Sequence, residues 1–299
     1  MAVCLAAVVA GGAAASSAHL GKGRPHFALA DVVEIHSAHG SSFVPALEGN
    51  RPLFILALGS DARPGQNILR ERSDSIHLIG VDLRRHRATI LGFPRDSWVP
   101  IPGHGTTKIN TAMALGGPQL TVRTIESLTG IRIDFWMLTS FAGLRGMVNG
   151  IGGLTINVPR RMHDRFSGAF FSRGRHLVHG AGALAFARDR HDVPGGDLGR
   201  SANQGRLMLA ALTQLRTVFD KNPGDILTWI AVGWRHVRTT LGLASLVELA
   251  LTATKVPPAN VRNMVVPART GTIGSASVVF ITPAARAIYA DMRADGVVG

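Results

Sequence analysis

The chain has 299 residues, a formal net charge of +13 and a single cysteine, Cys4. It is long enough to bury one large hydrophobic core or two modest ones, and one cysteine excludes both an internal disulfide and a zinc site built on cysteines. Of the 32 basic residues, 4 are Lys and the other 28 are Arg. Arg presents a planar fork of donors that suits phosphate and carboxylate oxygens, although a GC-rich genome also favours Arg codons. Such a charge allows a nucleic acid, an anionic membrane or an anionic small substrate as the partner.

The first 20 residues carry no charged side chain, and the first basic residue is Lys22. Their length is borderline for a membrane span, and they lack the positive start of a typical signal peptide. We expect residues 1–20 to form an N-terminal membrane anchor or signal, with an Ala-rich tail as the remaining alternative. Residues 21–50 are rich in Gly, Ser, Pro and His, which is typical of a linker. A globular domain is expected over residues 51–299.

Strands and helices alternate along this domain. Continuous apolar runs predict buried strands, and turn residues between two of them predict an antiparallel pair at 75–82 and 88–93. Helices are predicted where Ser, Asp or Pro precedes a periodic apolar pattern and Gly follows it; their apolar stripes are assigned to the core. The expected strands are 53–59, 75–82, 88–93, 133–139, 154–159, 261–267 and 275–281, and the expected helices are 116–130, 140–153, 180–190, 197–215, one from 225, 243–255 and one from 282. The fold class is therefore α/β, with a central sheet covered by helices.

Four short polar segments lie just outside apolar runs: GSDAR (59–63), RSDS (72–75), PRDSWVP (94–100) and ARDRHDVPGGDLGRSANQ (187–204). Side chains beyond strand ends are where open α/β sheets usually build ligand sites. Asp61 and Asp74 flank one loop, and together they could hold Mg²⁺, which commonly uses one or two carboxylates plus substrate phosphate oxygens. The alternative is that Asp61 caps a turn and Asp74 pairs with Arg72.

The fourth segment carries closely spaced Arg residues. Arg188 and Arg190 could share a ligand if the chain is extended there, whereas a helix would splay them by roughly 200°. Arg200 and Gln204 lie four residues apart, hence on one helix face, and Arg200 is near a helix N-terminus, where anions are favoured. The alternative for each Arg pair is a solvated surface. The prediction of an anion site rests on the four segments taken together.

Several motifs are missing. The sequence has no G-x-x-x-x-G-K-[ST], no G-x-S-x-G and no G-x-G-x-x-G after a strand. No basic helix is interleaved with aromatic residues, and the chain has a single Tyr, so stacking on nucleic acid is not indicated.

In this order, the segments resemble the LytR–CpsA–Psr family of bacterial cell-wall ligases. The resemblance covers roughly residues 51–215 and rests on LGSDAR, RSDSIHLIGVD, the run from ILGFPRDSWVP to ESLTGI, GIGGLTINVP, ALAFARDR and GDLGRSANQ, with weaker similarity after residue 260. It implies an αβα sandwich with a central mixed β-sheet, a hydrophobic lipid pocket and an Arg-rich pyrophosphate site. It also implies a single-pass membrane protein whose catalytic domain lies outside the cytoplasm.

The implied activity is Mg²⁺-dependent transfer of a glycopolymer from a polyprenyl-pyrophosphate carrier to peptidoglycan. By matching positions, Asp61 and Asp74 would bind Mg²⁺. The residues implied to line the phosphates are Arg72, Arg95, Arg188, Arg190, Arg200 and Gln204, and those implied to be catalytic are Asp74, Arg95, Arg188 and Arg190. Arg63 and Asp96 lie in the motifs but are weaker candidates for direct contact.

The last segment departs from the family pattern Arg-x-x-Arg-Gln-Gln, because Asn203 and Gly205 replace one Arg and one Gln. The donor polymer therefore stays open among arabinogalactan, teichoic acid and capsule, with the Ala and Arg bias favouring an actinobacterial polymer. Two other functions compete with the transferase. Water could attack the pyrophosphate at the same site, which would make a hydrolase, or the positive charge could serve a DNA-binding regulator.

Overall fold

The computed structural model describes residues 45–299. The predicted anchor at 1–20 and most of the predicted linker lie outside these residues. Within residues 45–299, no helix is both long enough and apolar enough to cross a membrane.

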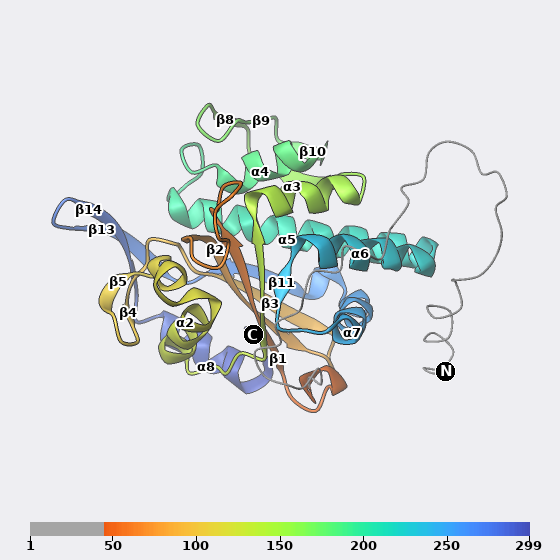
Figure 1. The fold of residues 1–299 in the computed structure, drawn as a ribbon, viewed down its shortest axis with the longest axis horizontal. Helices are drawn as coiled ribbons and strands as arrows, with labels where there is room; N and C mark the ends of the chain where they lie inside the picture. Colours follow the sequence, from red (N-terminus) through yellow and green to blue (C-terminus); the bar gives the residue numbers. More distant parts are fainter. Residues whose placement is uncertain (1–44) are drawn as a thin grey trace. The chain divides into compact units, whose positions relative to one another are not determined.

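A six-stranded sheet forms the centre of the fold, in the order β11-β6-β1-β2-β3-β12 (Figure 1). Its strands are β1 (Leu53–Ser60), β2 (Ser73–Asp82), β3 (Arg87–Gly92), β6 (Phe135–Ser140), β11 (Arg238–Thr239) and β12 (Val261–Val265). The β1–β2, β2–β3 and β6–β11 pairs are antiparallel, whereas β1–β6 and β3–β12 are parallel. The sheet is therefore mixed, and the predicted hairpin of β2 and β3 is confirmed.

Helices cover both faces of this sheet. On one face, Phe54 and Leu56 pack with residues of α2 (Thr111–Thr129) and α8 (Ala285–Asp295). On the other, α5 (Asp197–Lys221), α6 (Ile226–His236) and α7 (Leu243–Thr254) lie together, and Leu53 and Ile55 are buried toward that side (Figure 1). Neighbouring β1 residues enter different cores because side chains alternate along a strand. The expected αβα sandwich is confirmed.

A third group of elements packs beside α5. It comprises α3 (Phe141–Gly150), α4 (Gly180–Arg188) and the pair β7 (Leu154–Val158) and β10 (Gly174–Val178), which share one apolar cluster around Phe186. The predicted Ser start of α3 is confirmed, because the Ser140 hydroxyl accepts a hydrogen bond from the Gly143 N–H at 3.0 Å. Such a cap satisfies an N–H group that the helix itself leaves free.

Short strands account for most differences from the sequence-based expectation. The pairs β4–β5, β8–β9 and β13–β14 project from the sandwich, and only β14 was predicted as a strand. Their bounds are Trp98–Ile101 and Gly105–Lys108, Met162–Asp164 and Ala169–Phe171, Ala268–Ile273 and Ala276–Ile281. Three 3-10 turns, Pro45–Glu48, Pro223–Asp225 and Pro258–Asn260, complete the described elements.

Helix α2 begins before the predicted start at residue 116. Gly116 and Gly117 leave helical geometry, with φ +68° at Gly117, and Pro118 starts the second part of the helix. The predicted beginning near residue 116 is therefore the start of the second part of α2, and the first part was not predicted. The predicted Gly end is confirmed: Gly130 is left-handed, with φ +68°, and its N–H donates to the Glu126 carbonyl at 2.8 Å.

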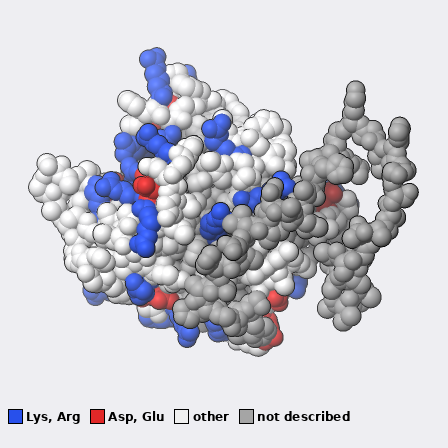
Figure 2. Space-filling model, viewed as in Figure 1, with Lys and Arg blue, Asp and Glu red and all other residues white. Residues whose placement is uncertain are grey.

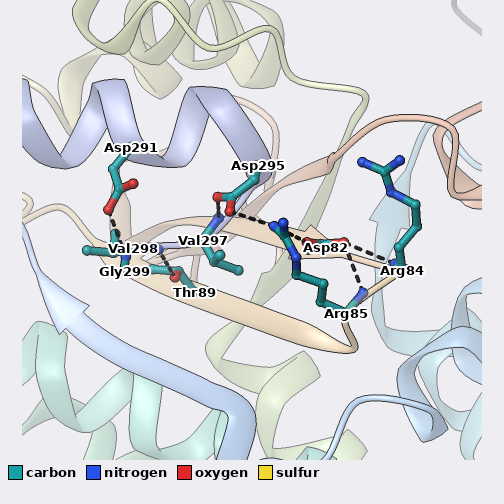
Figure 3. A network of polar contacts seen from close by, with 9 residues as sticks. All are labelled: Asp82, Arg84, Arg85, Thr89, Asp291, Asp295, Val297, Val298 and Gly299. Carbon is teal, nitrogen blue, oxygen red and sulfur yellow. Dashed lines mark hydrogen bonds and ion pairs between the residues drawn. The ribbon is translucent and has the colours of Figure 1, made fainter.

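Both ends of the described segment pack on the sheet. Ala46, in the first 3-10 turn, is fully buried with Leu53, so ordered packing begins before residue 51. At the other end, Figure 3 shows polar contacts between the C-terminal residues and the region of the β2–β3 turn. Arg85 Nη1 lies 3.2 Å from an Asp295 oxygen, and the Val298 N–H donates to the Thr89 hydroxyl at 2.9 Å.

Candidate active site

An irregularity in the pairing of β1 with β2 places the first two carboxylates. Gly59 pairs with Ser75 and Ser60 with Ser73, so Asp74 is an extra residue on β2, as in a β-bulge. The Asp61 N–H donates to the Arg72 carbonyl at 3.0 Å immediately beyond this point. Asp61 and Asp74 therefore lie at the same end of the two strands.

The loop after β3 adds a cation to these carboxylates. Arg95 Nη1 donates to Asp74 Oδ1 at 2.5 Å, and both side chains are less than a quarter exposed. The loop is fixed because the Asn110 N–H donates to the Arg95 carbonyl at 3.2 Å. Asp96, the next residue, pairs with Lys108 Nζ at 3.1 Å. The alternative pair of Asp74 with Arg72 does not form.

The start of α5 brings in the fourth segment. Arg200 is buried and pairs with Asp197, the first residue of the helix. Gln204 is buried on the same helix face, and its Nε2 lies 3.1 Å from the Asp74 carbonyl and 3.2 Å from the Ala187 carbonyl. One amide therefore joins β2, the end of α4 and the start of α5. The predicted proximity of Arg200 and Gln204 to Asp74 is observed.

The charges of this cluster act on one another. Burial, followed by the negative charge of Asp74, raises the pKa of Asp61. Burial lowers the pKa of the Arg200 guanidinium, a change opposed by Asp197 and reinforced by Arg95. Arg95 Nε and Asp197 Oδ2 are buried without a hydrogen-bond partner among the described residues. Two such atoms in one cluster indicate that it is built to receive a further polar group.

Other predicted residues lie outside these contacts. Arg63, Arg72, Arg188 and Arg190 are exposed, and none forms an ion pair within residues 45–299. The Arg188 guanidinium lies over the Phe141 ring, 5.2 Å from its centroid, at the end of α4 that Gln204 contacts. A role for these four guanidinium groups toward phosphate stays a prediction. The face drawn in Figure 2 carries many more Lys and Arg than Asp and Glu side chains.

Two members of the cluster were not among the predicted site residues. Asp197 holds Arg200, and Lys108 holds Asp96. The spacing of Asp197 and Arg200, three residues apart at the start of a helix, is a signal that could have identified the first. Lys108 lies at the end of β5, which the sequence did not predict, so no signal placed it beside Asp96.

An apolar pocket, called the tunnel below, adjoins this cluster. It has a volume of about 460 Å³ and runs between the sheet and helices α3 to α7. Ser75, Ala187 and Gln204 line it near the cluster, and Trp229 and Leu249 line it elsewhere. On α5 the tunnel face continues from Gln204 through Leu207, Ala211 and Leu215. These apolar residues were assigned to the core; part of the stripe instead lines the tunnel.

Comparison with known proteins identifies the family of this chain. The model described as the LytR_cpsA_psr family matches residues 14–292. The chain belongs to this family. It is 34% identical over 179 residues to the regulatory protein MsrR of Staphylococcus aureus (strain COL), a match that covers 59% of this chain and 51% of that protein. The predicted family is therefore confirmed, and the chain spans about half the length of this relative.

Two further members carry names that describe a ligand or an activity. The TagU protein of Enterococcus faecalis, named a polyisoprenyl-teichoic acid–peptidoglycan teichoic acid transferase, is 29% identical over 207 residues, covering 69% of this chain and 67% of that protein. The structure of YwtF (TagT) from Bacillus subtilis with bound octaprenyl pyrophosphate lipid superimposes with a TM-score of 0.62 at 22% identity. It covers 80% of this chain and 87% of that one, and at this identity the likeness shows the fold.

The cluster offers two carboxylates, Asp61 and Asp74, as a donor set for the predicted Mg²⁺. No group of three or more His, Cys, Asp and Glu side chains suited to a metal occurs within residues 45–299. Asp61 and Asp74 are two carboxylates close enough for one to raise the pKa of the other, and a hard cation between them would relieve that repulsion. Mg²⁺ commonly takes one or two protein carboxylates and completes its shell with water and phosphate oxygens. The two residues therefore fit the predicted metal.

Proposed function

We propose that the chain transfers a glycopolymer from a polyprenyl-pyrophosphate carrier to a hydroxyl of peptidoglycan. One observation carries the proposal: a partly buried cluster of guanidinium and carboxylate groups lies at an apolar tunnel, and Gln204 belongs to both. A lipid pyrophosphate has the same two parts, an apolar chain and a diphosphate. The names of the TagU relative and of the TagT lipid complex support this choice.

The chemistry follows from where charge develops. The acceptor hydroxyl attacks the phosphorus nearest the glycan, a new P–O bond forms, and the bond to the bridging oxygen breaks, so that the lipid monophosphate departs. The hydroxyl proton passes to a carboxylate of the cluster; Asp61 and Asp74 are the candidates. Arg95 and Arg200 are held rigidly by Asp74 and Asp197, so they can stabilise the growing negative charge without reorganising. Arg188 and Arg190 would approach the diphosphate from the end of α4.

Mg²⁺ belongs to this proposal as the cofactor held by Asp61 and Asp74. It would neutralise charge on the diphosphate when bound. No other protein ligand is needed for the metal, because phosphate oxygens complete the coordination.

The membrane setting is also a proposal. A polyprenyl carrier resides in a lipid bilayer, so its diphosphate is available only to a protein held at the membrane. The uncharged N-terminal segment would serve as the single-pass anchor. The described domain would lie on the outer side of the membrane, because the proposed acceptor, peptidoglycan, lies there.

The test measures transfer from a lipid-linked donor to peptidoglycan by the wild type and by Arg95→Ala and Arg95→Lys. Losing one preorganised donor should lower the transfer rate about a hundredfold, with partial recovery in the Lys variant, and chelation of Mg²⁺ should abolish transfer. Arg123→Ala is the matched control, because Arg123 is exposed on α2 and forms no ion pair in the described chain. Wild-type transfer rates in purified Arg95→Ala would refute the assignment.

The same assay separates transfer from hydrolysis. If water is the physiological acceptor, lipid monophosphate will be released at the same rate with and without peptidoglycan. If the chain is a transferase, peptidoglycan will accelerate the release and will carry the labelled glycan.

A further inference from the structure

Helix α5 presents a second stripe of residues that the tunnel does not use. The tunnel stripe contains Gln204, Leu207 and Ala211, whereas Gly199, Arg206 and Thr213 line separate cavities. Residues 204 and 206 are two apart on a helix, so their side chains diverge by roughly 200°. The second stripe therefore faces away from the tunnel, toward β7, β10 and the loops that precede β8 and α5.

The cavity nearest the start of α5 is basic and has no acidic lining residue in the described chain. Its volume is about 290 Å³, and Arg160 and Arg206 both line it. Burial lowers the pKa of Arg206, and the positive charge of Arg160 lowers it further, so the two guanidinium groups lie close enough to repel. Neither forms an ion pair within residues 45–299. Two unneutralised cations facing one cavity would be stabilised by an anion.

Asn203 adds a buried polar group to the same cavity. It is 1% exposed, its Oδ1 accepts a hydrogen bond from Arg206 Nη1 at 2.8 Å, and its Nδ2 has no partner in the described chain. The Asn203 contact orients the Arg206 guanidinium, and both residues line the cavity. A buried donor without a partner is destabilising, so a ligand acceptor that reached it would be favoured.

A larger cavity of about 1000 Å³ continues along the same stripe of α5. Arg206 and Pro159 line both cavities, which therefore adjoin. Arg175 and Lys221 are the other cations of the larger one, and again no acidic residue lines it in the described chain. Its remaining wall mixes amide and hydroxyl groups, as at Asn157 and Thr213, with apolar surface, as at Leu177.

We propose that these two cavities form one groove that binds an anionic glycan chain, with Arg160 and Arg206 holding a carboxylate or phosphate group of that chain. Arg forks match both anions bidentately, the hydroxyl and amide groups suit sugar hydroxyls, and the apolar surface suits the faces of sugar rings. The groove begins at Gly199, one residue before Arg200 of the active-site cluster, so this end of the groove lies within one turn of α5 from that cluster. Its assignment to a substrate of this enzyme rests on the proposed function.

The experiment measures the dissociation constants of three soluble ligands by calorimetry with the whole chain. The probes are a glycerol-phosphate oligomer, a disaccharide pentapeptide of peptidoglycan and the neutral chitotetraose. The two charged probes distinguish phosphate from carboxylate as the bound anion. We expect at least one charged probe to bind more tightly than chitotetraose and to lose about tenfold in affinity in Arg206→Gln and in Arg160→Gln. Arg206→Lys should retain most of the affinity.

The matched control is Arg123→Gln, which removes the same charge from the opposite helical layer and should leave all three constants unchanged. The groove assignment is wrong if neither charged probe binds more tightly than chitotetraose, if the control loses as much affinity as Arg160→Gln, or if a DNA duplex outcompetes both glycans. Octaprenyl pyrophosphate is titrated in parallel. A chain that binds the charged glycan but not the lipid pyrophosphate would uphold the groove and overturn the proposed function, and the reverse result would overturn the groove alone.

Discussion

At the scale of single residues, His77 connects the sheet to the active-site helix. It is fully buried on β2, its Nε2 lies 3.1 Å from the Ser201 carbonyl, and its Nδ1 lies 3.1 Å from the Ser75 hydroxyl. A carbonyl can only accept, so Nε2 carries the proton and Nδ1 accepts from Ser75. Burial lowers the pKa of His77 from 6.5 to about 4, so the folded protein keeps this ring neutral.

This lowered pKa predicts a loss of stability in mild acid. Between pH 6.5 and pH 4 the unfolded chain binds a proton at His77 that the folded chain does not, so the free energy of unfolding falls as the pH falls. From pH 7 to pH 4.5 the wild type should lose roughly 2 kcal/mol more than His77→Gln. Urea unfolding of both proteins at the two pH values measures this difference. Other titrating groups cancel in the comparison, and equal losses in the two proteins would show that His77 is not held neutral.

The sequence predicted the location of some site residues correctly and of others only in part. Asp74, Arg95, Arg200 and Gln204 were predicted because each belongs to an ordered motif, and the structure gathers them. Arg188 was predicted from its own motif, yet its guanidinium lies against Phe141. A motif identifies a residue type at a position, but the rotamer of a long, exposed side chain depends on neighbours that only the fold supplies.

At the scale of elements, one glycine decides how α4 meets α3. A Cβ at Gly180 would lie 2.3 Å from the Arg145 carbonyl oxygen and 2.6 Å from its Cα, both of them backbone atoms. Gly180→Ala should therefore separate the two helices and lower the free energy of unfolding by about 1–3 kcal/mol. Chemical denaturation measures the change. Gly180→Ala should also weaken lipid pyrophosphate binding, because the end of α4 supplies the carbonyl that Gln204 contacts.

Gly233→Ala is the matched control for this substitution. Gly233 lies inside α6, and a Cβ there would meet no atom within 4 Å. Because Ala favours a helix interior over Gly by about 0.5–1 kcal/mol, this variant should be as stable as the wild type or more stable. If the two variants unfolded at the same denaturant concentration, the close approach of α3 and α4 would not limit what residue 180 can be.

The elements found from the sequence are those with a strong period or a long apolar run. The buried strands β1 to β3 and the helices α3 to α7 were located because burial on known faces leaves a pattern in the sequence. The pairs β4–β5 and β8–β9 were missed because their strands have only three or four residues each, too few to establish an alternating pattern. The first part of α2, before Gly116, was missed because Pro118 marks the start of the second part.

At the scale of the whole molecule, the tunnel is made jointly by the sheet and helices α3 to α7. The sequence could not show it, because an apolar stripe on α5 has the same pattern whether it faces a filled core or a cavity. The distinction depends on whether α3, α6 and α7 close over that stripe, which is a property of the tertiary packing. In the structure they line a tunnel of about 460 Å³ instead of filling it.

The tunnel predicts that lipid length controls binding to this protein. Each methylene taken from water into an apolar site contributes about 0.8 kcal/mol, so octaprenyl pyrophosphate should raise the melting temperature more than farnesyl pyrophosphate at equal concentration. Ala250 lines the tunnel on α7, and Ala250→Phe should fill it and remove the advantage of the longer lipid. Ala244 is exposed on the same helix, so Ala244→Phe should keep that advantage. Equal melting shifts for the two lipids in the wild type would mean that the isoprenoid chain lies outside the tunnel, because only chain burial makes affinity depend on length.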